Sequence, residues 1–500
     1  MSVSTRIRYR PAVPVPWAAA VSWTAAGLVV VLLLAVIVRL PWAGDLGMHA
    51  ATLQRLRHDP LHPGNPLVDA DTPSPYYSPW MLLLGLLARA SGWSVFVVLR
   101  IAAVAGLALL VTGVWRYVRT LSAHRAAPAL GLLSLLLVWG TTAYTWSGFP
   151  GLGSLALTVS YPSTFALGLA FHLWARLTTA LRGAGGWGTW LGLGAVWAVV
   201  LLCHQFTGVV ASIGALAALL AVRRPRSIPW PQLAAALLLG AALLAAWPYY
   251  DFFALVGAGD DLADTHRGLY RDWPVRYGLV LAGVAALAAR ARRDPRDPLL
   301  LFFALGLLFV AAGWLTGRHS WGRALPAALI PAQLALALEA LEAGRRWLRA
   351  AWAVLLTGVL LAGAWVQSGT LGYVLPRDAL PAPAEARYRE PWNGYHWITP
   401  WVRYGDVVLA EKHPARRIPA YGPYTVAPGY PDVFLPDADR RTSAVERYFT
   451  PGTPAAVRRD VERTYGARWV VDAYHVLDDT GLRPVATGPD GQVLYRVPGP

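Results

Sequence analysis

A carboxylate and an imidazole lie four residues apart in the stretch GDLGMHAATLQRLRHDP, shortly after the first long apolar segment ends at Leu40. On a helix, Asp45 and His49 would share one face and could pair. An ionised Asp can take a proton from a hydroxyl, which is the task of a general base. Asp is also a favoured helix N-cap, which accepts from the backbone two or three residues on. The local pattern leaves base and cap equally open.

Two further carboxylates follow in the same loop. Asp69 and Asp71 flank Ala70 in NPLVDADTPSPYYSP. Carboxylate oxygens are hard ligands that suit Mg²⁺ or Mn²⁺, so this pair is a candidate metal site. In a Pro-rich loop, however, Asp residues more often form turns. Both interpretations stay open at this point.

The composition indicates where these residues must lie. The chain has 500 residues, of which 56% are hydrophobic and 14% charged, whereas a soluble globule has about 25% charged residues. The chain is therefore predicted to be an α-helical, multi-pass membrane protein. The formal charge of +16 does not indicate a nucleic-acid partner, because the arginines cluster in short loops between apolar runs.

Apolar stretches of spanning length predict eleven membrane spans. They lie near 17–40, 94–116, 127–147, 161–181, 187–203, 206–222, 231–250, 275–290, 298–316, 323–343 and 348–367. The stretch 79–91 is too short to span and suits an interfacial or re-entrant helix. The positive-inside rule then puts the Arg-rich loops and the basic N-terminus (Arg6, Arg8, Arg10) in the cytoplasm and the C-terminus outside.

Two elements outside the spans would position the polar residues. The first outer loop, 41–93, is expected to contain an amphipathic helix over 46–57 that lies on the membrane. Residues 1–372 would form the membrane domain, and residues 373–500 a small extracytoplasmic α/β domain. In that domain we expect strands at 406–411 and 468–474, helices at 443–449 and 454–465, and a terminal hairpin over 485–497.

Several motifs resemble those of the GT-C superfamily of membrane glycosyltransferases. They are Asp45 just beyond the first span, His49 four residues on, the Gly-Asn-Pro loop, and the entry Tyr76-Tyr77-Ser78-Pro79 into a short apolar helix. CHQFTG at 203–208 is similar to the His-x-x-Thr-Gly turn of bacterial members, and AAWPYYDFF, the GRHSWGRALP turn and the soluble tail also fit.

The resemblance implies a bacterial plasma-membrane enzyme. It would move a sugar from a polyprenyl-phosphate carrier to a glycan, lipid or protein acceptor on the extracytoplasmic face, with inversion, and Asp45 would be the base. The departing phosphate would require cations at the outer rim. The candidate substrate-binding residues are His49, Tyr76, Tyr77, His204, Arg271, Arg318, His319 and Arg323. His266 and Arg267 are further cationic candidates.

Two other classes of function remain open. A transporter or flippase of lipid-linked glycans would need a polar route through the bilayer, for which His172 and Gln205 are candidates. A non-catalytic envelope scaffold would keep the fold without turnover. The polar residues concentrate at the outer rim and not in mid-membrane, which favours the enzyme.

Overall fold

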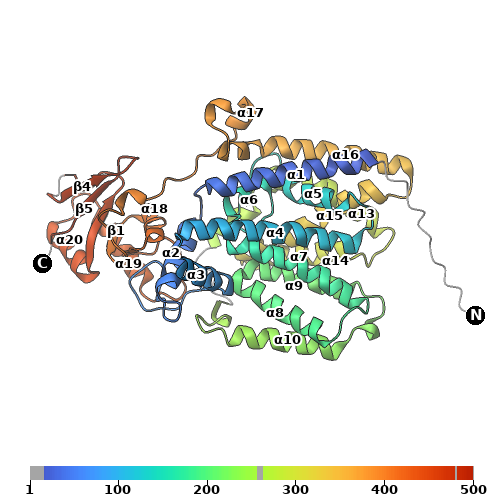
Figure 1. Ribbon diagram of the computed structural model, residues 1–500, viewed down its shortest axis with the longest axis horizontal. Coiled ribbons are helices and arrows are strands. Elements are labelled where there is room, and N and C mark those ends of the chain that lie inside the picture. Colours follow the sequence, from blue (N-terminus) through green and yellow to red (C-terminus); the bar gives the residue numbers. More distant parts are fainter. Residues whose placement is uncertain (1–15, 256–262, 479–480, 499–500) are drawn as a thin grey trace, which may run out of the picture.

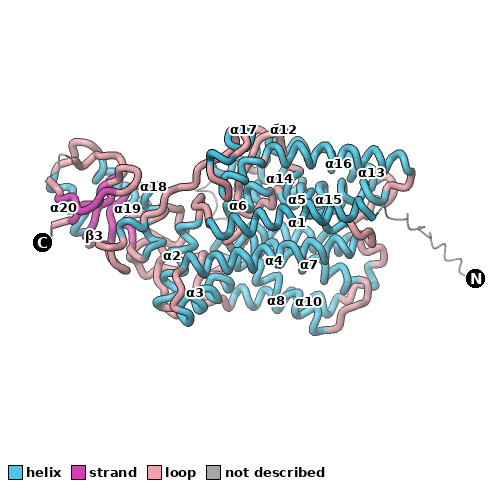
Figure 2. The backbone as a smooth tube through the Cα atoms, turned by 45° about the horizontal axis from the view of Figure 1, so that its top comes forward, coloured by secondary structure: helices cyan, strands magenta, loops and turns pink. Residues whose placement is uncertain are grey.

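A long helical bundle forms most of the molecule, and a small sheet lies at one end of it (Figure 1). The computed structural model describes residues 16–255, 263–478 and 481–498. The described chain enters at the end of the bundle remote from the sheet and finishes in the sheet. The bundle helices run roughly along the long axis of the molecule, and the strands gather at the C-terminal end (Figure 2).

Serine and aspartate caps and prolines at first turns begin several of these helices. Ser78 and Ser94 accept from the backbone N–H groups of Met81 and Val97, and Asp297 caps another helix in the same way. The helices of the bundle are α1 (Pro16–Arg39), α2 (Leu46–His58), α3 (Pro79–Ser91), α4 (Val95–Leu121), α5 (Ala127–Leu137), α6 (Leu152–Thr158), α7 (Pro162–Leu181), α8 (Trp187–Cys203), α9 (Gln205–Leu220), α10 (Trp230–Ala245), α11 (Ala263–Arg267), α12 (Trp273–Tyr277), α13 (Leu281–Ala291), α14 (Pro298–Leu315), α15 (Pro326–Glu342) and α16 (Arg346–Val366).

The prediction of a helical multi-pass membrane protein is confirmed. In the described part of the chain, six helical stretches are long and apolar enough to cross a membrane, and five shorter apolar helices accompany them. The short helix α3 coincides with the stretch 79–91. The count of eleven spans and the orientation of the termini stay predictions, and Arg6, Arg8 and Arg10 lie outside the described residues.

One predicted span is shorter than expected. The stretch 127–147 is helical only as far as Leu137. Beyond it, the Thr141 N–H donates to the Val275 carbonyl at 2.7 Å. A Cβ on Gly140 would lie 2.1 Å from that same carbonyl oxygen, so only glycine allows this close approach. The chain therefore leaves the helix to pack against the segment before α13.

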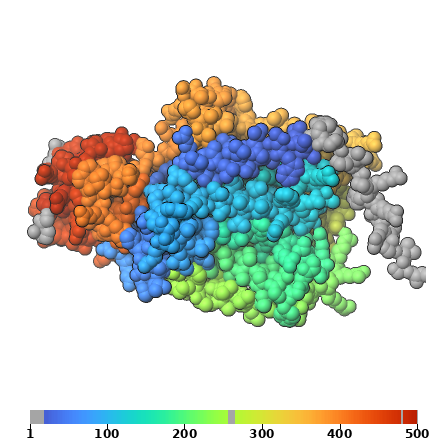
Figure 3. Space-filling model, in the orientation of Figure 1, coloured from blue at the N-terminus to red at the C-terminus, as the bar shows by residue number. Residues whose placement is uncertain are grey.

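The helix expected over 46–57 is present as α2, but its surroundings differ from the prediction. Residues on every side of α2 are buried, so no polar face is left for solvent or lipid headgroups. The guanidinium of Arg55 is buried and donates to the carbonyls of Gly422 and Pro423, both at 2.7 Å. Gln54 of α2 donates to the Ala420 carbonyl at 3.0 Å, so α2 packs against the C-terminal region. The space-filling view shows blue N-terminal residues against the orange C-terminal part of the chain (Figure 3).

The C-terminal region contains the strands and helices that the sequence predicts. The strands β1 (Val407–Ala410), β2 (Tyr424–Thr425), β3 (Ala467–Asp472), β4 (Arg483–Thr487) and β5 (Val493–Arg496) have the order β2-β1-β3-β5-β4. β1 is parallel to β2 and β3, and β5 is antiparallel to β3 and β4. The helices are α17 (Ala382–Glu385), α18 (Lys412–Ala415), α19 (Ala438–Phe449) and α20 (Ala455–Thr464).

The two-residue strand β2 was not predicted, and it connects the sheet to the first outer loop. Val68 forms a parallel bridge with Thr425, whose N–H donates to the Leu67 carbonyl at 2.9 Å. The first outer loop therefore adds backbone pairing to the edge of the sheet. The domain boundary between residues 372 and 373 stays a prediction.

Candidate active site

Asp45 lies where the chain leaves the bundle and enters the first outer loop, directly before α2. Its carboxylate accepts no capping hydrogen bond from α2, so the N-cap interpretation is wrong. The side chain is half-buried and forms no hydrogen bond or ion pair with any other described residue. A carboxylate in this state keeps its lone pairs available for a ligand.

Two tyrosines hold the backbone that carries Asp45. The Tyr161 hydroxyl donates to the Ala43 carbonyl at 2.5 Å, and the Tyr430 hydroxyl donates to the Gly44 carbonyl at 2.7 Å. Gly44 has φ of +51°, a conformation that glycine adopts without strain. Tyr161 precedes α7 and Tyr430 belongs to the C-terminal region, so both parts of the protein fix the position of Asp45.

Two arginines act on the carboxylate from different elements. Arg323 belongs to the 3₁₀ helix η6 (His319–Ala324), and Arg416 follows α18. Burial raises the pKa of Asp45, and the positive charges of Arg323 and Arg416 oppose that rise. Neither arginine forms an ion pair with Asp45. The carboxylate is therefore close to two cations without being neutralised by direct contact.

Arg323 is held by groups from the bundle. Its Nη2 lies 3.3 Å from His204 Nε2 and 3.3 Å from the Ser147 carbonyl oxygen. The guanidinium lies 4.3 Å from the centre of the Phe206 ring, at cation–π distance. Its Nε is buried and has no hydrogen-bond partner among the described residues. Arg323 thus keeps a donor that a bound anion could accept.

The imidazole of His204 is neutral, and it holds Arg323 in this form. Burial lowers the pKa of His204 well below its ordinary value, and Arg323 lowers it further. Nδ1 of His204 accepts from the Thr207 backbone N–H at 3.2 Å and lies 2.7 Å from Thr207 Oγ1, which fixes the orientation of the ring. His204 therefore orients Arg323 and does not add a second positive charge.

His49 does not pair with Asp45 as the spacing predicts. Its ring lies edge-on to Tyr161, 4.6 Å between ring centres, and its buried Nδ1 has no partner among the described residues. Burial lowers the pKa of His49 to about 3, so the ring is neutral at physiological pH. The link to Asp45 runs through the backbone, where the His49 N–H donates to the Asp45 carbonyl at 3.1 Å.

The two predicted tyrosines of the first loop differ in position. Tyr76 is half-buried, and the negative charge of Asp45 adds to burial in raising the pKa of Tyr76. Tyr76 therefore belongs to the Asp45 cluster, which also contains Tyr161, His204, Arg323, Arg416 and Tyr430. Tyr77 is buried, its hydroxyl donates to the Gly64 carbonyl at 2.8 Å, and its ring packs near Tyr249. The contacts of Tyr77 indicate that it supports the loop.

Three of the remaining predicted cations, Arg271, Arg318 and His319, lie apart from these contacts, whereas His266 is close to Arg323. Arg271 and Arg318 are exposed, and His319 packs against Tyr270 and Trp314. His266 is buried, and burial together with Arg323 lowers its pKa to about 4. No contact joins Arg271, Arg318 or His319 to Asp45 within the described chain. A role for these three in binding stays a prediction.

The two carboxylates predicted to bind a metal ion do not form part of a cluster of metal ligands in the described chain. Asp69 and Asp71 are both exposed. In residues 16–255, 263–478 and 481–498, no group of three or more His, Cys, Asp or Glu side chains could hold a metal ion. The donors present therefore do not fit a buried Mg²⁺ or Mn²⁺, and no reaction step is assigned to such an ion.

Three members of the cluster were not found in the sequence: Tyr161, Arg416 and Tyr430. Arg416 and Tyr430 are 371 and 385 residues from Asp45 along the chain, and no local spacing connects them to it. Tyr161 carried one usable signal, since it precedes Pro162 at the start of an apolar run.

No protein-family model matches the chain, and neither does any curated protein sequence. Solved structures do match. The arabinofuranosyltransferase AftD from mycobacteria matches at a TM-score of 0.57 and 16% identity, over 97% of this chain and 42% of that one. The oligosaccharyltransferase of Archaeoglobus fulgidus matches at a TM-score of 0.46 and 13% identity, over 95% of this chain and 74% of that one.

This chain thus spans less than half of the length of the mycobacterial protein. At this level of identity the likeness concerns the fold alone. It extends over nearly the whole chain, as the motifs of the first outer loop and the mid-chain turn had suggested. The chain therefore shares its fold with this arabinofuranosyltransferase, as the resemblance to the GT-C superfamily implied.

Proposed function

We propose that this protein is a membrane glycosyltransferase in which Asp45 is the general base. It would transfer a sugar from a polyprenyl-phosphate carrier to a cell-envelope acceptor, with inversion. The observation that carries the proposal is the Asp45 carboxylate, which is half-buried, uncapped, and acted on by two arginines without an ion pair. The shared fold supports the same class of reaction.

The proposed step balances in atoms and charge. The acceptor hydroxyl attacks the anomeric carbon while Asp45 takes the hydroxyl proton. The new glycosidic C–O bond forms as the bond between the anomeric carbon and the phosphate oxygen breaks. The carrier leaves as a phosphate anion that keeps the bonding electron pair.

The surroundings of Asp45 suit a base. Burial raises the pKa of Asp45, which makes the carboxylate a better proton acceptor than an exposed Asp. The positive charges of Arg323 and Arg416 oppose that rise and favour the ionised form of the carboxylate.

The same arginines would bind the leaving phosphate. Arg323 is anchored by His204 and the Ser147 carbonyl, and its unpartnered Nε is a free donor within the described chain. Arg416 is anchored through its Nε, which donates to the Gly429 carbonyl at 2.9 Å. Cations fixed in place beforehand stabilise developing negative charge without rearrangement during the reaction.

The proposed location is the bacterial plasma membrane. The N-terminus would be cytoplasmic, and the C-terminal region and Asp45 would face the extracytoplasmic side. In the structure, α2, which Asp45 directly precedes, lies at the end of the bundle that carries the sheet, opposite the end at which the described chain begins (Figure 1). That arrangement is compatible with a lipid-linked donor entering from the outer leaflet.

Thermal stability of the detergent-purified protein tests the donor class. We expect one polyprenyl-phosphate sugar from a panel to stabilise the protein, by about 2.7 kcal/mol at a hundredfold excess over Kd. Bare polyprenyl phosphate should stabilise less. The variant Arg323→Gln should lose the response, and Arg226→Gln, an exposed arginine outside the candidate site, should keep it. No response of the folded protein to any lipid phosphate would favour the transporter or scaffold alternatives.

A further inference from the structure

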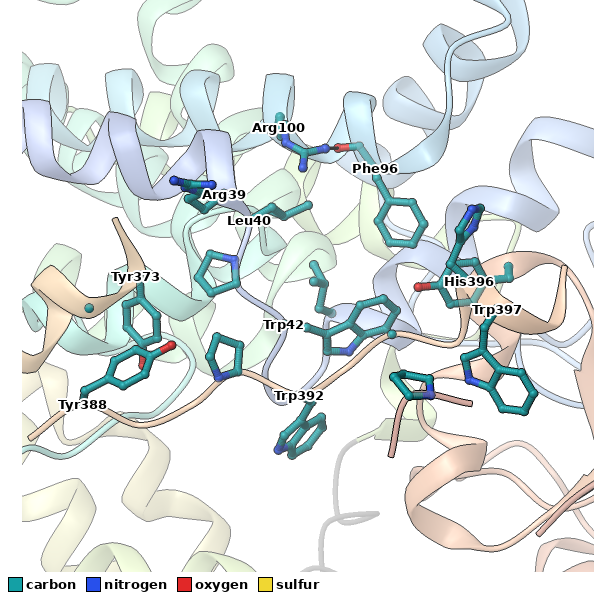
Figure 4. A pocket seen from close by; sticks show the side chains of 17 residues that line it. Arg39, Leu40, Trp42, Phe96, Arg100, Tyr373, Tyr388, Trp392, His396 and Trp397 are labelled. Atoms are coloured by element: carbon teal, nitrogen blue, oxygen red, sulfur yellow. Dashed lines mark hydrogen bonds between the residues drawn. The ribbon is translucent and has the colours of Figure 1, made fainter. Parts of the chain in front are cut away.

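A cavity of about 770 Å³ lies next to Leu46, the first residue of α2 (Figure 4). It opens between the outer ends of α1 and α4 and the segment 388–397 that leads to the sheet. Asp45 does not line this cavity, but Leu46, the next residue, does. The volume is in the range of cavities that hold small organic ligands.

Aromatic rings form the walls of this cavity, which we call the groove. Trp42 and Phe96 come from the bundle side, and Tyr388, Trp392 and Trp397 come from the segment that leads to the sheet (Figure 4). The backbone N–H of Trp392 donates to the backbone carbonyl of Trp42 at 2.8 Å, which fixes the two sides of the groove relative to each other. The groove is therefore a built feature with flat apolar faces.

Polar donors lie among these rings. Trp42 is only 8% exposed, yet its indole N–H has no hydrogen-bond partner among the described residues. The buried indole N–H of Trp397 is unpartnered in the same described ranges. Because a buried donor without a partner is costly, these two groups point to a ligand that carries acceptor oxygens.

The charged residues that line the groove limit the kinds of ligand that it could bind. Arg39 and Arg100 line the bundle end of the groove, and no carboxylate lines it. Arg100 donates to the carbonyls of Val38 and Phe96, at 3.0 and 3.3 Å, while Arg39 is exposed. A cationic ligand or a basic peptide would find no carboxylate to pair with and would be repelled by the two arginines. A neutral or anionic ligand rich in oxygen atoms would find hydrogen-bond donors here.

We propose that this groove binds a carbohydrate chain, as the acceptor-holding subsite of the transferase. This inference rests on the proposed function. Sugar rings present C–H faces that pack on aromatic rings and hydroxyl oxygens that accept from indole N–H groups. A glycan that fills the groove would contact Leu46, one residue from Asp45. The groove would hold the body of the acceptor while its terminal hydroxyl reaches the base.

Binding of soluble oligosaccharides to the purified full-length protein tests the proposal. The probes are linear hexasaccharides of arabinofuranose, mannose and glucose, measured by calorimetry. We expect at least one to bind, and Trp392→Ala and Trp397→Ala each to weaken it about tenfold, the value of one aromatic contact. Trp401→Ala is the matched control, since Trp401 is 39% exposed against 37% for Trp392 and does not line the groove.

Three results would overturn the inference. One is that no hexasaccharide binds the folded wild-type protein. Another is that binding is equally strong in the two tryptophan variants. A third is that the variants lose binding of phosphatidylglycerol nanodiscs and no saccharide binds, which would identify a lipid site. Asp45→Asn should bind the hexasaccharide normally, so a failure of the proposed base and a failure of this groove give different results.

Discussion

Gly47 on α2 provides a geometric test of the Asp45 site. A Cβ on Gly47 would lie 2.0 Å from the Arg416 carbonyl oxygen and 3.1 Å from its carbonyl carbon. The atoms in the way are backbone, so no side-chain rotation relieves the overlap. Gly47→Ala must therefore push α2 and the segment after α18 apart by about 1 Å. The Tyr430 hydroxyl, which bonds the Gly44 carbonyl at 2.7 Å, joins the same two parts.

The expected magnitude follows from this separation. Overpacking of this kind costs about 1–3 kcal/mol of stability, so the protein should still fold. Moving Arg416 by about 1 Å relative to Asp45 should lower the transfer rate about 100-fold. The assay follows transfer of a radiolabelled sugar from its polyprenyl-phosphate carrier, together with the melting temperature of each variant.

Two glycine variants separate the effect on the site from the effect on stability. A Cβ on Gly85 of α3 would lie 2.4 Å from Leu56 Cβ, which overpacks α2 about 16 Å from Asp45. Gly85→Ala should lose stability and keep most of its activity. A Cβ on Gly27 meets no atom within 4 Å, so Gly27→Ala should change neither. Wild-type activity and stability in Gly47→Ala would refute the contact between α2 and the C-terminal region.

Three further outcomes follow from the structure. Arg416→Gln removes a charge that lowers the pKa of Asp45, so the acid limb of the kcat/KM profile should move to higher pH; an unmoved limb would exclude Arg416 from the site. Burial raises the pKa of Glu411 from 4.5 to about 7, so the folded state favours the protonated form and loses about 1–2 kcal/mol as pH rises through that window. In chemical denaturation, Glu411→Gln should not lose this folding stability as pH rises. The same pH dependence of stability in Glu411→Gln and the wild type would contradict the prediction. Arg55→Met leaves the buried carbonyls at 422–423 without donors and should cost about 2–4 kcal/mol, with faster hydrogen exchange in that segment; unchanged exchange would argue against the contact.

The sequence predicted the parts of the site that lie at the ends of apolar runs. Asp45, His204 and Arg323 each stand at the boundary of a hydrophobic segment, where a polar residue is conspicuous. The secondary structure of the C-terminal region was predictable for the same reason, because strands and helices differ in hydrophobic period. These features depend on residues that are close in sequence.

The remaining features depend on contacts between distant residues. Arg416 and Tyr430 reach Asp45 only because the C-terminal region folds back onto α2. The choice between cap and base depends on where the Asp45 carboxylate points, which spacing cannot give. Likewise, the end of α5 at Leu137 depends on the close approach of Gly140 to Val275.

Transfer by Asp45→Asn tests the central claim most directly. The amide keeps the size of the carboxylate but cannot take the acceptor proton. We predict that Asp45→Asn folds, is stabilised by the same lipid-linked sugar as the wild type, and transfers at least about 100-fold more slowly, as expected for loss of a general base. Full transfer activity in well-folded Asp45→Asn would contradict the role of Asp45 as the base.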